Sequence, residues 1–551
     1  MSTVVIDTFD DPVTLDPHRA QETGSQHAVL NVYDGLLGFD RTGRLRPVLA
    51  AELPATTDRG GEPHLLLPIR EGVRFHDGSR FTVEDAVYSL RRVAVTASVP
   101  AALWSDALLG MPVAKLSAEA ALDMAARITA TEDGLLLRLA RPYGPLQALL
   151  AQWSCVVHRG WCAERGAWDG ELATLGAHLL PGATALDGRA NGTGQYRLDE
   201  WDRERRELRY HKVVRDFVGA EPGPDVILLR SVDDSAQRER ELTEGTADFS
   251  VCLTESRARL SQSPGVVVEE VTEVRSINPI AFITQKLDPD SYAVGSGEFA
   301  PDGIPPNAFS DVHLRRMISL CFDHQTYATE VLDGAAMPHA VPFPAPMVPG
   351  ITPSWPVTDL DRARAEYAAA WDGRMARSGC RIVIYTHDTN VSRVCAAEML
   401  AEGLHRVDDR ITPEIVPLSI SKLASMLYTS QCPVAWSGWG ADFLHPYALA
   451  SALLDPRTPL PSALGIDSPE LTRLVTEARA HDPGASADPG PYRALHEYTT
   501  QNALFLAPPG KIDFMMYRDR WATVGLKNRI PHILDFASFE PRQGTGTPND
   551  Q

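Results

Sequence analysis

The chain has 551 residues, 44% of them apolar and 23% charged, which is typical of a globular protein with more than one core. Its formal charge of -20 opposes a nucleic-acid partner, which would need a concentrated basic face. No apolar run reaches the ~18 residues of a membrane span. Only six of the 52 basic residues are lysine, an arginine excess that is typical of GC-rich coding, as in actinobacteria.

The N-terminus and the cysteines bear on where the protein works. Val4-Val5-Ile6 reads as a strand, with no basic and apolar leader before it. Either a leader was removed and the protein is extracytoplasmic, or Met1 is the native start and it is cytoplasmic. Cys155 and Cys162 could close a disulfide loop in an exported protein, whereas isolated buried thiols are the alternative. No cysteine or histidine spacing suggests zinc, so we expect neither a metal nor a cofactor.

In the first half of the chain, short strands alternate with amphipathic helices. Strands are predicted at residues 4–6, 65–75, 195–201 and 226–230, a charged hairpin at 203–212, and helices at 26–33, from Thr82, at 117–128, 145–153 and 236–244. Gly192-Thr193-Gly194 could cradle a phosphate, but a strand rather than a helix follows it, which favours a structural turn. His76-Asp77 could relay protons, yet the following glycine makes an Asp-Gly turn the simpler interpretation.

The pattern restarts near residue 279. Strands are predicted at residues 281–284, 382–385 and 434–436, and a last strand pair at 505–517. Helices are predicted from Asp311 and at 392–404, 471–480 and 492–502, with one long loop at 286–309. The strand at 434–436 is expected to follow the helix at 392–404 directly in a βαβ-like unit. This alternation predicts an α/β protein with mixed sheets.

The segment at 436–442 carries the most functional information. Glycines 438 and 440 bracket Trp439, so another chain could approach the main chain there, and Asp442 offers a charge to a cation. This combination suits an ammonium-bearing ligand. The alternative is a strand-to-turn junction in which Trp439 is core and Asp442 accepts from turn amides.

Motifs for catalysis are absent from the sequence. There is no Gly-x-Ser-x-Gly elbow, Walker loop or His-Glu-x-x-His helix. His445-Pro446 beside Asp442 is a weak acid–base candidate, and an ordinary turn is the alternative. We therefore predict no catalytic residue, and an enzyme only if the chain is natively cytoplasmic.

Several separated segments together resemble the family 5 extracellular solute-binding proteins, the oligopeptide- and dipeptide-binding components of ABC importers. The segments are LDP at 15–17, VYDGL at 32–36, IREGVRFHDG at 69–78, TVED at 82–85, GTGQY at 192–196, DVHLRR at 311–316 and GWGAD at 438–442. The block at 69–85 is the most specific of them, and the resemblance covers nearly the whole chain.

The resemblance implies a periplasmic-binding-protein type II-like α/β fold of three lobes. Lobe I would comprise residues 1–42, 186–273 and 503–551, lobe II residues 43–185, and lobe III residues 274–502. Two of the lobes would close on a ligand about crossing segments near 274–282 and 504–514. Closure would bury the ligand between preformed surfaces.

The resemblance also implies roles for individual residues. Asp442 would accept the ligand ammonium, Gly438 and Gly440 would pair with the ligand backbone, and Trp439 would form an apolar wall. The loop Gln21-Glu22-Thr23 would face the ligand from lobe I. Trp104 would do so from lobe II, unless it lies in an apolar core.

The chain departs from the pattern of peptide binders at three positions. Ile420 replaces an aromatic, Trp436 replaces an arginine just ahead of the Gly-Trp pair, and Ile283 replaces an asparagine of a crossing strand. The leading function is a monomeric receptor that delivers a peptide or amine-bearing metabolite to ABC permease subunits. The alternatives are a leaderless cytoplasmic protein that binds or modifies a metabolite, and an oligosaccharide or metal-chelate binder in which Trp104, Trp436 and Trp439 stack on sugar rings.

Overall fold

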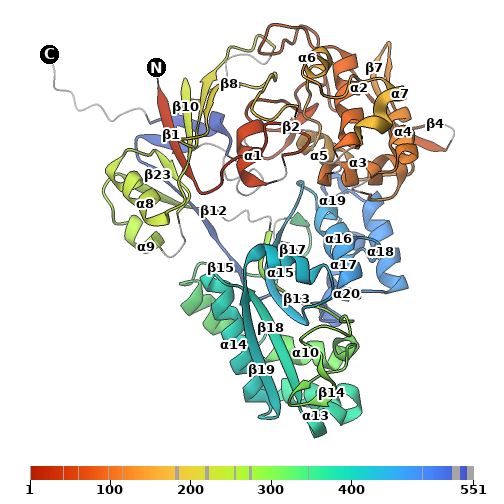
Figure 1. The fold of residues 1–551 in the computed structure, drawn as a ribbon, viewed down its shortest axis with the longest axis vertical. Coiled ribbons are helices and arrows are strands. Elements are labelled where there is room, and N and C mark those ends of the chain that lie inside the picture. The colour runs from red at the N-terminus through yellow and green to blue at the C-terminus, as the bar shows by residue number, and fades with distance from the viewer. Residues whose placement is uncertain are drawn as a thin grey trace. The chain divides into compact units, whose positions relative to one another are not determined.

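The computed structural model divides into two compact units, each described by itself (Figure 1). Unit 1 is Met1–Glu273 with Asp513–Gln551, and unit 2 is Val274–Ile512, so the chain enters unit 2 once and returns once. The structure describes residues 2–20, 22–40, 42–59, 61–96, 98–113, 116–179, 185–217, 222–252, 256–271, 276–344, 347–486, 488–523 and 534–542. The division of residues 1–273 into two lobes stays a prediction.

Unit 1 contains a seven-stranded sheet of order β12-β23-β11-β1-β10-β9-β8 and a four-stranded sheet of order β4-β5-β7-β6. In the larger sheet β1 is parallel to β10 and β11, and the other neighbours are antiparallel. The strands are β1 Thr3–Thr8, β2 Leu37–Phe39, β3 Leu45–Pro47, β4 Thr56–Arg59, β5 Glu62–Leu67, β6 Ile128–Thr131, β7 Gly134–Arg138, β8 Tyr196–Asp202, β9 Glu207–Lys212, β10 Val226–Ser231, β11 Phe249–Ser250, β12 Val266–Val271, β23 Asp513–Arg518, β24 Trp521–Thr523 and β25 Phe539–Pro541.

The helices of unit 1 include each of those predicted, with shifted ends. They are α1 Thr23–Val29, α2 Val83–Arg92, α3 Val99–Leu109, α4 Ala118–Ala126, α5 Leu146–Gln152, α6 Arg159–Glu164, α7 Leu172–Leu175, α8 Ser235–Glu244 and α9 Arg257–Leu260. The predicted extension of the first helix to residue 33 is wrong. The Asn31 amide donates to the carbonyls of His27 and Leu534 and accepts from the Phe536 N–H, so its side chain fixes a turn instead.

The motifs behind the resemblance build this unit. The Arg92 guanidinium donates two hydrogen bonds, of 2.7 and 2.6 Å, to the carboxylate of Asp16, and both side chains are buried. Although burial alone would raise the pKa of Asp16, Arg92 outweighs it and the pKa is lowered. The two segments that contain these residues are thereby tied together by a buried ion pair.

The glycines at 192 and 194 are structural, as the turn interpretation predicts. A Cβ at Gly192 would lie 1.9 Å from the Val32 carbonyl oxygen, so only glycine fits there. One ring nitrogen of His76 is 2.8 Å from the Gly194 carbonyl oxygen, which places that histidine in the same contact. These residues therefore hold the fold of unit 1, and none forms a phosphate cradle.

Unit 2 is centred on a mixed five-stranded sheet of order β19-β18-β20-β13-β21. Strands β19, β18 and β20 are mutually parallel, whereas β13 is antiparallel to both β20 and β21. The strands are β13 Ser276–Ile283, β14 Gly295–Ala300, β15 Ala336–Met337, β16 His339–Ala340, β17 Phe343–Pro344, β18 Cys380–His387, β19 Ile411–Leu418, β20 Val434–Gly440, β21 Phe505–Leu506 and β22 Gly510–Lys511. Figure 1 shows the long strands β18 and β19 beside α14.

The order of strands in this unit corrects one prediction. The strand that follows α14 is β19, not β20, and it lies on the far side of β18. Pro413 and Pro417 obscure β19 in the sequence, because proline is unfavourable in a sheet interior. They are tolerated because β19 is an edge strand.

The helices of unit 2 cover the sheet and enclose a core that includes Trp436, Phe322 and Leu400. They are α10 Val312–Cys321, α11 His324–Thr326, α12 Leu360–Ala369, α13 Arg374–Ser378, α14 Val391–Val407, α15 Ile420–Leu427, α16 Tyr447–Leu454, α17 Pro459–Ala463, α18 Pro469–Ala480, α19 Pro483–Ser486 and α20 Pro491–Gln501. The predicted loop at 286–309 contains β14. In the described part of the chain, no helix is both long and apolar enough to cross a membrane.

The seven cysteines are all free thiols, so the disulfide alternative for Cys155 and Cys162 is wrong. Both are buried, and burial raises the pKa of Cys155 to about 12. These two thiols are structural core residues.

Candidate functional site

The carboxyl ends of three parallel strands meet at one edge of the unit 2 sheet. Residues 388–390 follow β18, Ser419 follows β19, and residues 441–446 follow β20. Because the three strands are parallel, the segments after them emerge on the same side. Loops gathered in this way are the usual source of binding residues in α/β sheets.

The strand order reverses between β18 and β20. The connection from β18 leads through α14 to β19 on one side, whereas β20 lies on the other side of β18. Ligands of open α/β sheets bind where the strand order reverses in this way. We therefore locate the candidate site at the carboxyl ends of β18 and β20.

Pairing between β18 and β20 ends before the carboxyl ends of the two strands. Strand β18 pairs with β20 at Ile384↔Val434 and Tyr385↔Ala435, and the described residues show no further pairing between these two strands. Strand β20 nevertheless continues to Gly440, held on its other side by β13 through Ile277↔Trp439 and Ser276↔Gly440. The edge of residues 436–440 that faces away from β13 is thus the part of the sheet where an extended ligand could add.

The two glycines that bracket Trp439 are not equivalent. A Cβ at Gly438 would lie 2.8 Å from Nη2 of Arg393 and 2.9 Å from Oδ1 of Asn278. Gly440 is exposed, and a Cβ there would meet no atom within 4 Å. The prediction that both glycines leave open space is therefore correct for Gly440 and wrong for Gly438, where side chains of the protein itself fill the space.

Arg393 is the functional candidate that the sequence reasoning missed. It lies in the first turn of α14, whose N-terminus is capped by the side chain of Asn390. Its Nη2 donates to Oδ1 of Asn278 at 3.1 Å, and its Nε is buried with no hydrogen-bond partner in the described part of the chain. One sequence signal could have found it: a cation in the first turn of a helix opposes the helix dipole.

Asp442 lies two residues beyond β20 and is half-buried. Loss of hydration raises the pKa of its carboxyl from 3.8 to about 6. The pKa of nearby Tyr428 is also raised, first by burial and then by the charge of Asp442. A carboxylate whose charged form is disfavoured in this way gains more from an incoming cation than one that is already well solvated.

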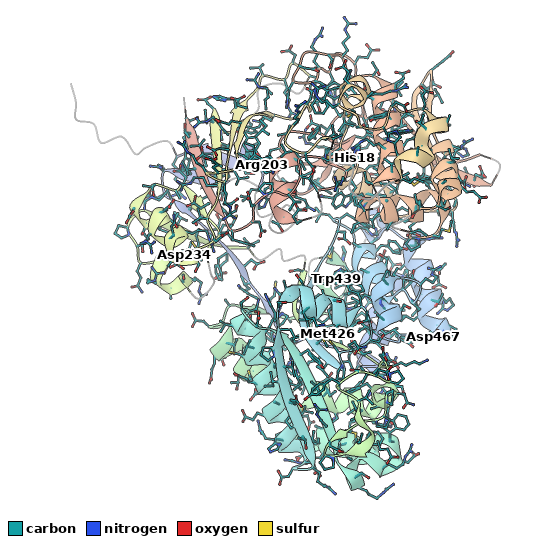
Figure 2. The ribbon with its side chains drawn as sticks, in the orientation of Figure 1. His18, Arg203, Asp234, Met426, Trp439 and Asp467 are labelled. Atoms are coloured by element: carbon teal, nitrogen blue, oxygen red, sulfur yellow. The ribbon has the colours of Figure 1, made fainter. Side chains whose placement is uncertain are left out.

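The tryptophans occupy different environments. Trp439, labelled in Figure 2, is half-buried and packs edge-to-face on Phe282, with ring centroids 6.4 Å apart. Trp436 is fully buried, 5.6 Å from the ring of Phe322. Trp104 is also fully buried, and its indole N–H donates to the Trp153 carbonyl. Trp439 alone of the three proposed tryptophans presents a surface.

The unit 1 candidates are Glu22 and Thr23. Exposed Glu22 precedes α1, and its carboxylate accepts from the Val13 N–H at 3.2 Å and from the Ser25 hydroxyl. Thr23 is half-buried at the start of that helix, and Gln21 lies outside the described residues. Because these residues belong to unit 1, their approach to the unit 2 residues stays a prediction.

The sequence also offers His445 as an acid–base candidate beside Asp442. His445 is buried, and its Nδ1 accepts from the Tyr447 N–H at 3.1 Å, as in the turn alternative. The described residues contain no group of three or more histidine, cysteine, aspartate or glutamate side chains that could hold a metal ion.

Two cavities lie elsewhere. One of about 340 Å³ in unit 1 is lined by residues that include Tyr33, Asp34 and Arg215. Another of about 440 Å³ in unit 2 is lined by residues that include Arg316, Val357 and Phe505. Neither is lined by residues 388–390, 419 or 441–446.

Comparison with known proteins agrees with this geometry. A family model described as "Bacterial extracellular solute-binding proteins, family 5 Middle" matches residues 47–459. The glutathione-binding protein GsiB of Escherichia coli is 28% identical over 261 residues, which is 47% of this chain and only 43% of that relative.

Solved structures show the fold over nearly the whole chain. The Helicobacter pylori periplasmic binding protein DppA, in complex with the peptide STSA, matches with a TM-score of 0.72 at 16% identity, covering 98% of each chain. A dipeptide-binding protein from a Pseudoalteromonas species, in complex with Met-Leu, matches with a TM-score of 0.73 at 15% identity, covering 98% of this chain and all of that one. The predicted periplasmic-binding-protein type II fold is confirmed.

Proposed function

The chain belongs to the bacterial extracellular solute-binding proteins of family 5, and from that premise we propose that it is the receptor of an ABC importer for a peptide or small amine-bearing metabolite. It would act outside the cytoplasmic membrane as a monomer and deliver its solute to the permease subunits. The similar structures with the peptide STSA and with Met-Leu support a peptide-like solute.

The unpaired edge of β20 followed by Asp442 is the observation that carries the proposal. The solute backbone would extend along residues 437–440, and its ammonium would reach the carboxylate of Asp442. Trp439 would pack against the solute, and Gly440 would leave room for its main chain. Main-chain pairing of this kind recognises a peptide backbone while leaving its side chains loosely specified.

Closure of two lobes would complete the site. The chain passes twice between the two units, and the proposed hinge is the pair of crossing segments near 274–282 and 504–514, of which residues 274 and 275 lie outside the described residues. Residues Glu22 and Thr23 of unit 1 would then meet the solute from the opposite side. The solute favours the closed form only through contacts that the open form lacks.

Calorimetry with Met-Leu, reduced glutathione and N-acetyl-Met-Leu tests the proposal. At least one of the two free amines should bind, and N-acetylation of Met-Leu should abolish binding of that dipeptide. Asp442→Asn should weaken the amine ligand at least about tenfold, since a charge-assisted hydrogen bond contributes about 1.5 to 3 kcal/mol. Asp409→Asn, at an exposed position of the same unit, is the control. Equal affinity of wild type and Asp442→Asn would reject the role of Asp442.

A further inference from the structure

The cavity of about 440 Å³ in unit 2 has no part in the proposed function. Helices α10, α12 and α20 and strand β21 contribute to its walls, so it lies within a single unit. None of the described residues that line it belongs to the segments after β18, β19 and β20, where the solute site is placed. Sites for small molecules usually have volumes of about 300 to 1,000 Å³. The cavity is therefore large enough for a ligand of its own.

Much of the cavity wall is apolar. Phe505 and Leu506 of β21 and the following Ala507 line it with buried side chains. On the solvent side, Val357 lines it and is 62% exposed, and Trp355, two residues earlier, is 52% exposed. Neighbouring exposed apolar side chains are typical of interaction sites. An apolar molecule bound here would remove this surface from water, which is favourable.

The charged residues of the cavity wall are mostly positive. Arg316 and Arg362 line it, and Glu366 is the only carboxylate among its described lining residues. Glu366 is already engaged, because one of its oxygens is 2.6 Å from Nδ1 of His313. Arg316 donates two hydrogen bonds, of 3.1 and 2.8 Å, to the neutral carbonyl of Gln501. Among the described residues, no hydrogen bond or ion pair involves the guanidinium of Arg362.

The other polar side chains of the wall add no charge. Burial lowers the pKa of His324 to about 4, so this histidine is neutral near pH 7. The hydroxyls of Thr499 and Thr500 donate to carbonyls of their own helix, at 2.7 and 2.9 Å. The two guanidiniums therefore determine the charge that the cavity favours. In a chain with a formal charge of -20, this is a local site for an anion.

We propose that this cavity is a second binding site, separate from the solute site, for a small amphipathic anion. An aromatic or branched aliphatic body would cover Phe505 and Val357, and a carboxylate or sulfonate would pair with Arg362. The apolar contact supplies affinity, and the guanidinium supplies the preference for a negative charge. The inference goes beyond the proposed function and does not depend on it, because the two sites share no residue.

A groove that holds only water is the competing explanation. The two explanations differ in what they predict for a molecule that combines an apolar body with an anion. A hydrated groove has no preference for such a molecule, whereas a built site binds it once per chain and loses it when the cavity is filled.

Fluorescence titration of the full chain with anilinonaphthalene sulfonate, an aromatic anion, tests the proposal. Wild type should bind one dye molecule per chain with micromolar affinity. Ser319→Phe, which fills the cavity from α10, should abolish this binding. Arg362→Gln should weaken the anionic dye about 3- to 10-fold and leave the affinity of the uncharged dye phenylnaphthylamine unchanged. Arg364→Gln, at an exposed position of the same helix that does not line the cavity, is the matched control.

The proposal is supported if Ser319→Phe loses the dye at an unchanged Tm and Arg362→Gln weakens the anionic dye alone. It is overturned if wild type shows no saturable binding, if folded Ser319→Phe keeps the dye, or if Arg362→Gln behaves like Arg364→Gln. Should Ser319→Phe fail to fold, the two arginine variants decide by themselves. None of these variants changes the solute site, so a negative result leaves the receptor role untouched.

Discussion

Asp442→Asn should stabilise the ligand-free protein while it weakens the binding of an amine. Burial raises the pKa of this carboxyl from 3.8 to about 6, so the folded protein holds the charged form at a cost. At about 1.36 kcal/mol per pKa unit, the full shift corresponds to about 3 kcal/mol. Because the side chain is only half-buried, solvent screening reduces the expected gain to about 1 to 2 kcal/mol.

The sign of the effect fixes its pH dependence. The folded pKa lies above the unfolded value of 3.8, so wild type gains stability as the pH falls through 6, and the gain is complete only below about pH 3, where the carboxyl is neutral in both states. The advantage of the asparagine is therefore full above about pH 7, small at pH 4 and absent below about pH 3.

Differential scanning fluorimetry at pH 8 and pH 4 measures this difference. A gain of 1 to 2 kcal/mol should raise Tm by about 2 to 8 °C at pH 8 in a unit of this size, and the shift at pH 4 should be much smaller. Asp409→Asn, at an exposed position, should change Tm at neither pH. An Asp442→Asn protein that is no more stable than wild type at pH 8 would show that the carboxylate is not strained by burial.

Three further outcomes are expected. Affinity for an amine ligand should fall about tenfold per pH unit below pH 6, because the ammonium needs the charged form of Asp442; calorimetry that finds it constant between pH 7 and 5 contradicts this. Gly438→Ala should weaken peptide binding in calorimetry by displacing the Arg393 and Asn278 side chains beside it, whereas Gly440→Ala should fold normally but also weaken binding, because its Cβ would occupy space proposed for the solute main chain. Asp16→Ala should destabilise unit 1 by about 3 to 5 kcal/mol in urea unfolding, since it leaves Arg92 buried and unpaired; a loss below 1 kcal/mol would refute the importance of that pair.

The sequence predicted much of the fold because its signals are local. The capping box of Thr82 and Asp85 and the helical periodicity at 392–404 and 471–480 all correspond to helices of the structure. The glycines at 192 and 194 were assigned to a turn from the strand that follows them, and their backbone contacts agree. These features depend on neighbours along the chain.

The parts that failed depend on residues distant in sequence. Strand β19 was not predicted because its two prolines are unfavourable in most strands. Without β19, the reversal of strand order between β18 and β20 cannot be predicted. Arg393 and Gly438 are 45 positions apart, and nothing local shows that the first fills the space beside the second. Trp436 and Trp439 look alike in the sequence, yet strand alternation sends one into the core and the other toward the surface.

A crystal structure of the protein with a bound peptide such as Met-Leu tests the account most directly. The account predicts that the ligand ammonium lies within hydrogen-bond distance of the Asp442 carboxylate and that the ligand main chain pairs with residues 437–440. A ligand held elsewhere, for example in the cavity beside Phe505, with Asp442 making no contact to it, would contradict the account.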